Sequence, residues 1–112
     1  MSMDIEVWSS EPFDLPAALP ELAHWTQTGF GHEFEGEGWL VHVSQEKEQP
    51  WKMVKKKLRG ASHVACITLE PIGASEDGYA FLEKVVRTLA RKCDGVWAVP
   101  EEQVHGPDEG EF

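Results

Sequence analysis

The sequence predicts an α+β fold with a mixed or mostly antiparallel sheet and helices on one face of it, in the order β-α-β-β-(short α)-β-α-β. Two observations lead to this prediction. The segment His63–Pro100 reads as strand, helix and strand, with the strongest apolar periodicity in the chain. Residues 25–44 alternate apolar and polar side chains on either side of a glycine-bearing turn, which is typical of a β-hairpin.

The first predicted strand is Asp4–Trp8, where aliphatic and acidic side chains alternate. This alternation indicates a strand with one buried face. A short helix is expected over residues 15–22, with Asp14 as its N-cap. We expect this helix to break at Pro20, because proline lacks the amide hydrogen that a helix interior needs.

The hairpin is expected to pair residues 25–35 with residues 39–44, and its register depends on the turn. A two-residue turn at Gly36-Glu37 would pair Phe34 with Trp39, whereas a three-residue turn would place two histidines, at positions 32 and 42, opposite each other. We favour the two-residue turn because it keeps the bulkiest side chains together. A change of one residue would move every side chain to the other face.

A short amphipathic helix is predicted over residues 50–60, before the strand His63–Leu69. That strand is a nearly continuous apolar run, which suits burial on both faces. The longest helix is expected from Glu76 to Cys93, after Ser75 as N-cap, since apolar residues recur three and four positions apart. Val96–Val99 is the last predicted strand. The two strands would run parallel through a right-handed crossover.

These elements fit one domain, residues 1–100, with a ferredoxin-like sandwich as the nearest named architecture. The analogy concerns the fold alone and carries no function. Residues 101–112 are acidic and contain glycine and proline, so we expect a flexible C-terminal tail.

The charge distribution excludes some function classes. The net charge of −10 argues against nucleic-acid binding, which requires a basic face. Residues 1–46 contain nine acidic residues and neither lysine nor arginine, while all ten basic residues lie between Lys47 and Lys92. No apolar run reaches membrane-spanning length, and the first residues do not resemble a secretory signal. We therefore expect a cytosolic protein, bacterial in style, without membrane association.

No pattern in the sequence names a reaction. The five histidines lack the spacing of a metal site, so neither a metal nor another cofactor is expected. Cys66 and Cys93 fall on apolar positions and are interpreted as buried, unpaired thiols. His63 and Cys66 lie three residues apart on a strand and are expected to point to opposite faces, which disfavours direct activation of the thiol by the histidine. We therefore do not expect an enzyme.

The function we expect is that of a small non-catalytic protein-binding domain, such as an inhibitor or immunity-type protein, that presents an acidic surface to a basic protein partner. The predicted contact residues lie in the first strand and the hairpin: Asp4, Glu6, Glu33, Glu35 and Glu37. The alternative is a small-molecule-binding domain or an enzyme with a pocket between sheet and helices, lined by Trp and His. The basic helix over residues 50–60 also leaves a homo-oligomer open, through contact with the acidic half of a second copy.

Overall fold

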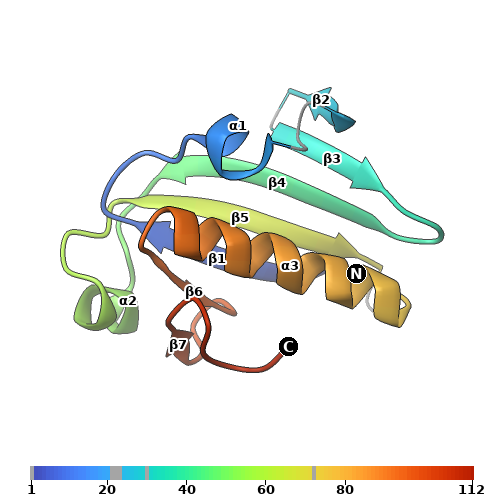
Figure 1. The fold of residues 1–112 in the computed structure, drawn as a ribbon. Coiled ribbons are helices and arrows are strands. Elements are labelled where there is room, and N and C mark those ends of the chain that lie inside the picture. Colours follow the sequence, from blue (N-terminus) through green and yellow to red (C-terminus); the bar gives the residue numbers. More distant parts are fainter. Residues whose placement is uncertain (1, 21–23, 30, 72) are drawn as a thin grey trace.

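The computed structural model describes residues 2–20, 24–29, 31–71 and 73–112, and Figure 1 shows their arrangement. In chain order the elements are β1 (Met3–Ser9), α1 (Leu15–Ala18), β2 (Thr26–Thr28), β3 (Gly31–Glu35), β4 (Leu40–Lys47), α2 (Lys52–Lys57), β5 (His63–Glu70), α3 (Glu76–Lys92), β6 (Val96–Ala98) and β7 (Val104–His105). The described strands form one sheet in the order β2-β3-β4-β5-β1-β6-β7.

The α+β class is confirmed. Of the two kinds of sheet expected, the mixed one is wrong, because every pair of neighbouring strands in the described residues is antiparallel. β5 and β6 do run in the same direction and are linked by α3. However, β1 lies between them and pairs with both. The strand order therefore differs from the predicted one, and the ferredoxin-like arrangement is not confirmed.

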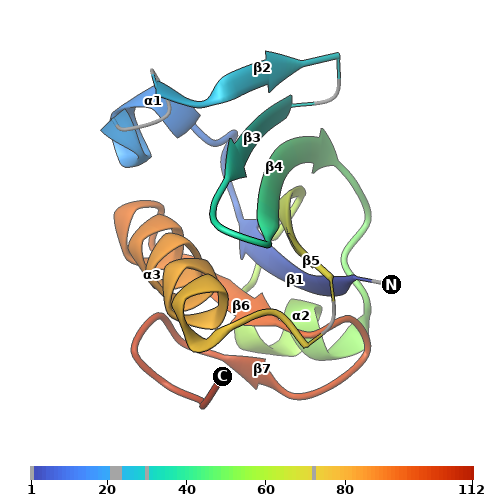
Figure 2. The same cartoon turned by 90° about the vertical axis from the view of Figure 1, so that its right-hand side faces the viewer.

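α1 and α3 cover one side of the sheet, as Figure 2 shows. The inner side chains of α3 are almost completely buried, at 0–1 % exposure: Leu82, Val85, Val86, Leu89 and Ala90. They pack in one core with odd-numbered residues of β1, β4 and β5: Ile5, Val7, Val41, Val43, Ala65, Ile67 and Leu69. Because strand side chains alternate in direction, these residues all point to the α3 side.

α2 lies on the opposite side of the sheet, which corrects the prediction that helices cover one face only (Figure 2). Its residue Val54 is fully buried in a second, smaller cluster with even-numbered residues of four strands, namely Trp8, Val64, Val96, Ala98 and Val104, and with Ala61 of the α2–β5 connection. An amphipathic helix buries its apolar face wherever apolar surface is available. Trp8, Val64 and Val96 make that surface at one end of the sheet only.

The predicted strand over residues 25–35 is instead two short strands, β2 and β3, which pair with each other so that Thr28 lies opposite Gly31. Gly31 is needed for a steric reason. A Cβ atom built at this position would lie 2.0 Å from the backbone oxygen of Val43. β3 can approach β4 this closely only because glycine has no side chain.

The β3–β4 connection differs from both registers considered for the hairpin. The Gly36 N–H donates to the Trp39 carbonyl over 2.9 Å, so Glu37-Gly38 forms the centre of the turn. Phe34 accordingly lies opposite Val41, and Glu33 opposite His42. Moving a two-residue turn by one position shifts the register by two. The predicted pairing is therefore wrong, but each side chain keeps its predicted face.

The predicted N-caps of α1 and α3 and the predicted length of α1 agree only in part with the structure. The Asp14 carboxylate accepts a hydrogen bond from the Ala17 amide over 3.3 Å, as expected of an N-cap. α1 is shorter than predicted, and residues 21 and 22 of the expected range lie outside the described residues. Ser75 precedes α3, but its hydroxyl makes no capping hydrogen bond.

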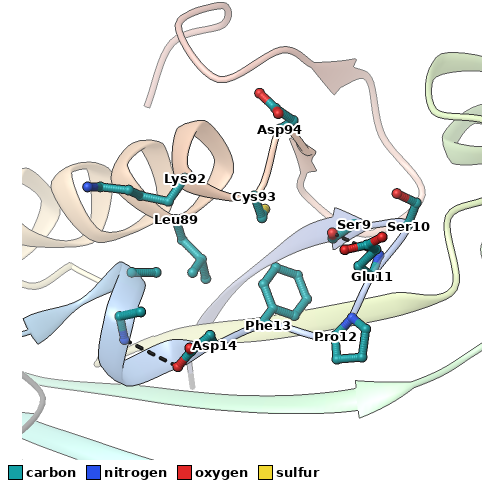
Figure 3. A pocket seen from close by; sticks show the side chains of 12 residues that line it. Ser9, Ser10, Glu11, Pro12, Phe13, Asp14, Leu89, Lys92, Cys93 and Asp94 are labelled. Carbon is teal, nitrogen blue, oxygen red and sulfur yellow. Dashed lines mark hydrogen bonds between the residues drawn. The ribbon is translucent and has the colours of Figure 1, made fainter.

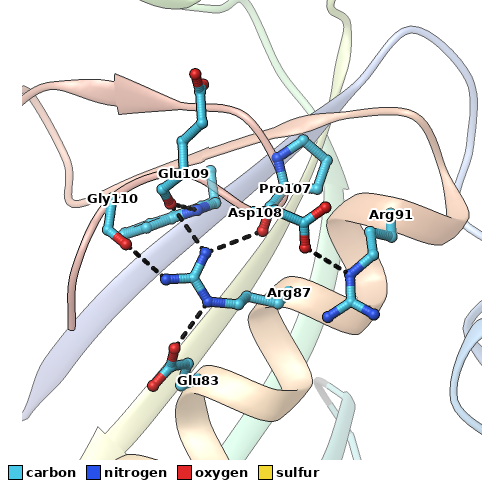
Figure 4. A network of polar contacts seen from close by, with 8 residues as sticks. Glu83, Arg87, Arg91, Pro107, Asp108, Glu109 and Gly110 are labelled. Atoms are coloured by element: carbon cyan, nitrogen blue, oxygen red, sulfur yellow. Dashed lines mark hydrogen bonds and ion pairs between the residues drawn. The ribbon is translucent and has the colours of Figure 1, made fainter.

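Residues 101–112 pack against α3 and the sheet edge, as Figure 4 shows. β7 belongs to this segment and pairs with β6. The Arg87 guanidinium bonds the Glu83 carboxylate over 2.8 Å. It also donates to three backbone carbonyls, at 2.6–3.0 Å, of Pro107, Glu109 and Gly110. These contacts join residues 107–110 to α3, while the domain boundary at residue 100 and the flexibility of the tail stay predictions.

Replacing Gly31 tests the close approach of β3 to β4. We expect Gly31→Ala to lower the free energy of unfolding by about 2 kcal/mol, since the backbone must move to remove the overlap with Val43. Urea-induced unfolding measures this change. Gly29→Ala is the matched control, because a Cβ atom there meets nothing within 4 Å. Equal effects of the two substitutions would contradict the steric explanation.

Candidate functional site

The candidate site is the side of the sheet that faces away from α3, which we call the open face. It presents the even-numbered residues of β1, β4 and β5 and the odd-numbered residues of β3. Six carboxylates belong to it: Asp4, Glu6, Glu33, Glu35, Glu46 and Glu70. None of the described strand residues that point to this side is lysine or arginine.

Strand pairing places these acids in rows that cross the sheet. One row joins four strands in the order Glu33, His42, Thr68 and Asp4. The next row places Leu40 between Glu35 and Glu70. Directly opposed residues lie about 5 Å apart. Residues that are as far apart in the sequence as Asp4 and Glu70 thus share one surface that is four strands wide.

Two of the six carboxylates are engaged in hydrogen bonds. Glu6 Oε1 accepts from the indole N–H groups of Trp8, at 3.0 Å, and of Trp51, at 2.9 Å. Trp51 immediately precedes α2, so this carboxylate fixes the helix to the sheet as well as carrying charge. Asp4 accepts from the Thr68 hydroxyl over 2.9 Å.

A shallow hollow of about 560 Å³ lies where the open face meets the β3–β4 turn. Three carboxylates line it, Glu33, Glu35 and Glu70. Its remaining lining residues are uncharged: Gly38, Trp39, Leu40 and Pro71. Carboxylates beside an apolar surface suit a lysine or arginine side chain, which has an aliphatic stem and a cationic end.

The structure brings four of the five predicted contact residues onto the open face: Asp4, Glu6, Glu33 and Glu35. Glu37 is exposed in the β3–β4 turn beside them. Glu46 and Glu70 also belong to the open face but were not among the predicted contact residues. Glu70 continues the alternation of Val64, Cys66 and Thr68 along β5, and this pattern was the available signal.

Cys66 lies among the acids of the open face. Burial raises the pKa of its thiol from 9.0 to about 11, and repulsion from nearby carboxylates, Glu6 first and then Glu46, adds to the rise. The thiol is therefore protonated at neutral pH and is a poor nucleophile. Cys66 lies opposite Glu6, whereas His63 lies opposite Ser9, so the two side chains point to opposite faces as predicted.

The histidines are dispersed. His42 lies on the open face and His32 on the α3 side, so they do not face each other. His105 stacks on Trp97 with the ring centroids 4.5 Å apart. Within residues 2–20, 24–29, 31–71 and 73–112, no group of three or more His, Cys, Asp and Glu side chains could hold a metal ion.

A second hollow, of about 530 Å³, lies between the β1–α1 connection and the end of α3, and Figure 3 shows its lining. Cys93 lies within it, and burial raises the pKa of its thiol. Two further polar groups there already have local partners. The Ser9 hydroxyl accepts from the Glu11 amide, and Asp14 caps α1. The arrangement resembles an ordinary helix–loop contact more than a reacting centre.

Comparison with protein-family models, with curated protein sequences and with solved structures finds no match. In the described part of the chain, no helix has the length and apolar character needed to span a bilayer. Any functional conclusion therefore depends on the surface chemistry of the domain itself.

The raised pKa of Cys66 predicts slow alkylation. In a Cys93→Ser background, we expect iodoacetamide at pH 8 to modify the folded protein more than tenfold more slowly than the urea-unfolded chain. The rate should rise with pH towards about 11. Folding stability should fall over pH 9 to 11, because the unfolded thiol loses its proton first. Equal rates in the folded and unfolded protein would contradict the assignment.

Glu6 should contribute to stability through its two indole partners. We expect Glu6→Leu to lower the free energy of unfolding by about 2 kcal/mol, since two N–H donors lose a charged acceptor. Thermal and urea unfolding measure this loss. Asp4→Leu is the comparison on the same strand and face. It removes two exposed hydrogen bonds, from the Ser2 hydroxyl over 3.5 Å and from the Thr68 hydroxyl over 2.9 Å, and a smaller change is expected.

Proposed function

We propose that this protein is a non-catalytic protein-binding domain that uses the open face of its sheet to bind a basic protein partner. The observation that carries this proposal is the grouping of six carboxylates from four strands on one face, without lysine or arginine among the described strand residues of that face. Carboxylates grouped on one face give it a negative potential and repel one another, although uncharged residues separate them across the strands. A cationic partner removes that repulsion on binding.

The hollow beside the β3–β4 turn supplies a specific contact. A lysine or arginine side chain entering it would lay its aliphatic stem against Leu40 and Pro71. Its charged end would reach the carboxylates of Glu33, Glu35 and Glu70. Charge-assisted hydrogen bonds of this kind are stronger than neutral ones. The other acids of the face would add long-range attraction, which accelerates association and weakens with salt.

An inhibitor or immunity-type role fits these properties. Such a protein needs fast encounter with its target, and opposite surface potentials provide it. The high pKa of Cys66 favours binding over nucleophilic chemistry on this face, because the thiol stays neutral at physiological pH. The sheet that carries the open face is backed by the apolar core and by α3, which give it a rigid support.

The test is an affinity capture from lysate at low and high salt, followed by purification of the captured protein and titration against the domain. We expect one basic protein, bound at low salt and released at high salt. Substituting Glu33→Gln and Glu35→Gln together should weaken its binding more than tenfold, since two charges of the hollow are removed.

The matched control is Glu11→Gln with Asp94→Asn, which removes the same charge from two exposed residues that line the hollow between the β1–α1 connection and the end of α3. A loss of affinity equal to that of the Glu33/Glu35 variant would show attraction to net charge alone and would refute the site. Sedimentation of the domain tests the remaining possibility, which is self-association. Self-association that disappears at high salt would assign the open face to the basic α2 of a second copy.

A further inference from the structure

Residues 104–112 form a segment that we call the strap, because it folds back over Trp97 and over the side of α3 that carries Arg87 (Figure 4). Its first residue, Val104, is almost fully buried and packs against Val54 in the second cluster. The strap is thus held at its start by apolar burial, and further along by contacts with Arg87 and Trp97.

Arg87 and Trp97 hold the strap by its backbone, and we call them the Arg87–Trp97 site. The Arg87 guanidinium donates to backbone carbonyls of three strap residues, Pro107, Glu109 and Gly110. The Trp97 indole N–H also donates to the Glu109 carbonyl, over 3.2 Å. The Arg87 side chain is only 14 % exposed, so packing fixes its position as well. Because every residue has a backbone carbonyl, these bonds recognise the path of the chain more than its side chains.

Two strap residues add selectivity for side chains. Gly110 has a φ of +78°, and a Cβ atom there would lie 2.7 Å from the Trp97 ring. Phe112 stacks on the Trp97 ring with the centroids 4.5 Å apart. The central carbon of the Arg87 guanidinium lies 5.2 Å from the centroid of the Phe112 ring. The site therefore selects a glycine that is followed two positions later by an aromatic residue.

The connection between β6 and the strap has the properties of a hinge. Residues 100–103 are all exposed. Glu101 has a φ of +64°, a left-handed backbone conformation that costs free energy in a residue with a side chain. The Glu102 amide donates to the Val99 carbonyl over 3.0 Å, which closes the turn. Extension of the connection releases the strain, and strained connections of this kind favour the exchange of an element between copies.

We propose that the Arg87–Trp97 site binds the strap of a second copy of this chain, so that two copies exchange their straps. The exchanged pair keeps the contacts of the single chain, because both copies carry the same site and the same strap. The attached strap competes at an effective concentration in the millimolar range, so exchange needs concentrated protein or a weakened strap. Exchange uses Arg87 and Trp97 rather than the six carboxylates of the open face, and so does not depend on the proposed function.

Mixing two complementary variants of the full chain tests the exchange. Val104→Ser with Gly110→Ala weakens the strap and leaves the site intact, whereas Arg87→Gln weakens the site and leaves the strap intact. We expect each protein alone to sediment as a monomer in about 1 M salt, where exposed charges are screened beyond about 3 Å. The mixture should form a one-to-one complex, in which the intact strap of the Arg87→Gln chain occupies the free site of the other chain.

Further substitutions in the chain that offers the free site separate specific binding from an effect of charge. Adding Arg87→Gln to that chain should abolish the complex. Lys84→Gln is the matched control, because it removes one positive charge from an exposed position of the same helix, and it should leave the complex unchanged. The Glu33→Gln/Glu35→Gln pair should also leave it unchanged, which separates this result from a failure of the proposed function.

A labelled peptide with the sequence of residues 104–112 gives a second measurement, by fluorescence anisotropy. It should bind the Val104→Ser/Gly110→Ala protein roughly tenfold or more tightly than the wild-type protein, whose own strap competes. The same peptide with Gly110→Ala should bind roughly tenfold more weakly. Gly110→Ala alone replaces the double variant if circular dichroism shows the latter to be unfolded. No complex in the mixture, equal effects of Arg87→Gln and Lys84→Gln, or equal binding of the two peptides would overturn the proposal.

Discussion

The packing of α3 against the odd-numbered residues of β1 and β5 is the contact on which the rest of the structure depends. It buries the side chains of Leu82, Val86 and Leu89 together with Ile5 and Ile67 in a single core. Because side chains alternate along a strand, burying one set of residues fixes where the other set points. The acidic open face is thus a direct consequence of how the core forms.

This coupling explains why Asp4 and Glu33, which are distant in sequence, belong to one surface. Each is next to a residue that the core requires, Ile5 in β1 and Phe34 in β3. Exchanging the faces would bury carboxylates, which is far more costly than the repulsion among them in water. The same coupling places Phe34 on the opposite side, where its ring packs against Phe81 of α3 and against Trp25 and Trp39.

Features that depend on local pattern could be predicted from the sequence, whereas those that depend on long-range pairing could not. β1, β5 and α3 were predicted to within about two residues, since alternation and helical periodicity are local signals. The hairpin register was missed because the segment Gly36–Gly38 accommodates more than one turn. No sequence pattern predicts that Arg87 contacts the carbonyl of Gly110, because the two residues belong to segments more than 20 residues apart. Glu70 lies beside the other acids of the hollow only because β5 pairs with β4.

The shortness of the two outermost strands has a consequence for how this domain meets other chains. β2 spans Thr26–Thr28 and β7 spans Val104–His105, so each border of the described sheet offers only two or three residues of unpaired backbone. Strand-by-strand growth into fibrils needs a longer template than this. The long strands β4, β5 and β1 are all interior and already paired on both sides. Contact through side chains is therefore the form of recognition that this architecture favours, and backbone-directed aggregation is the form that it suppresses.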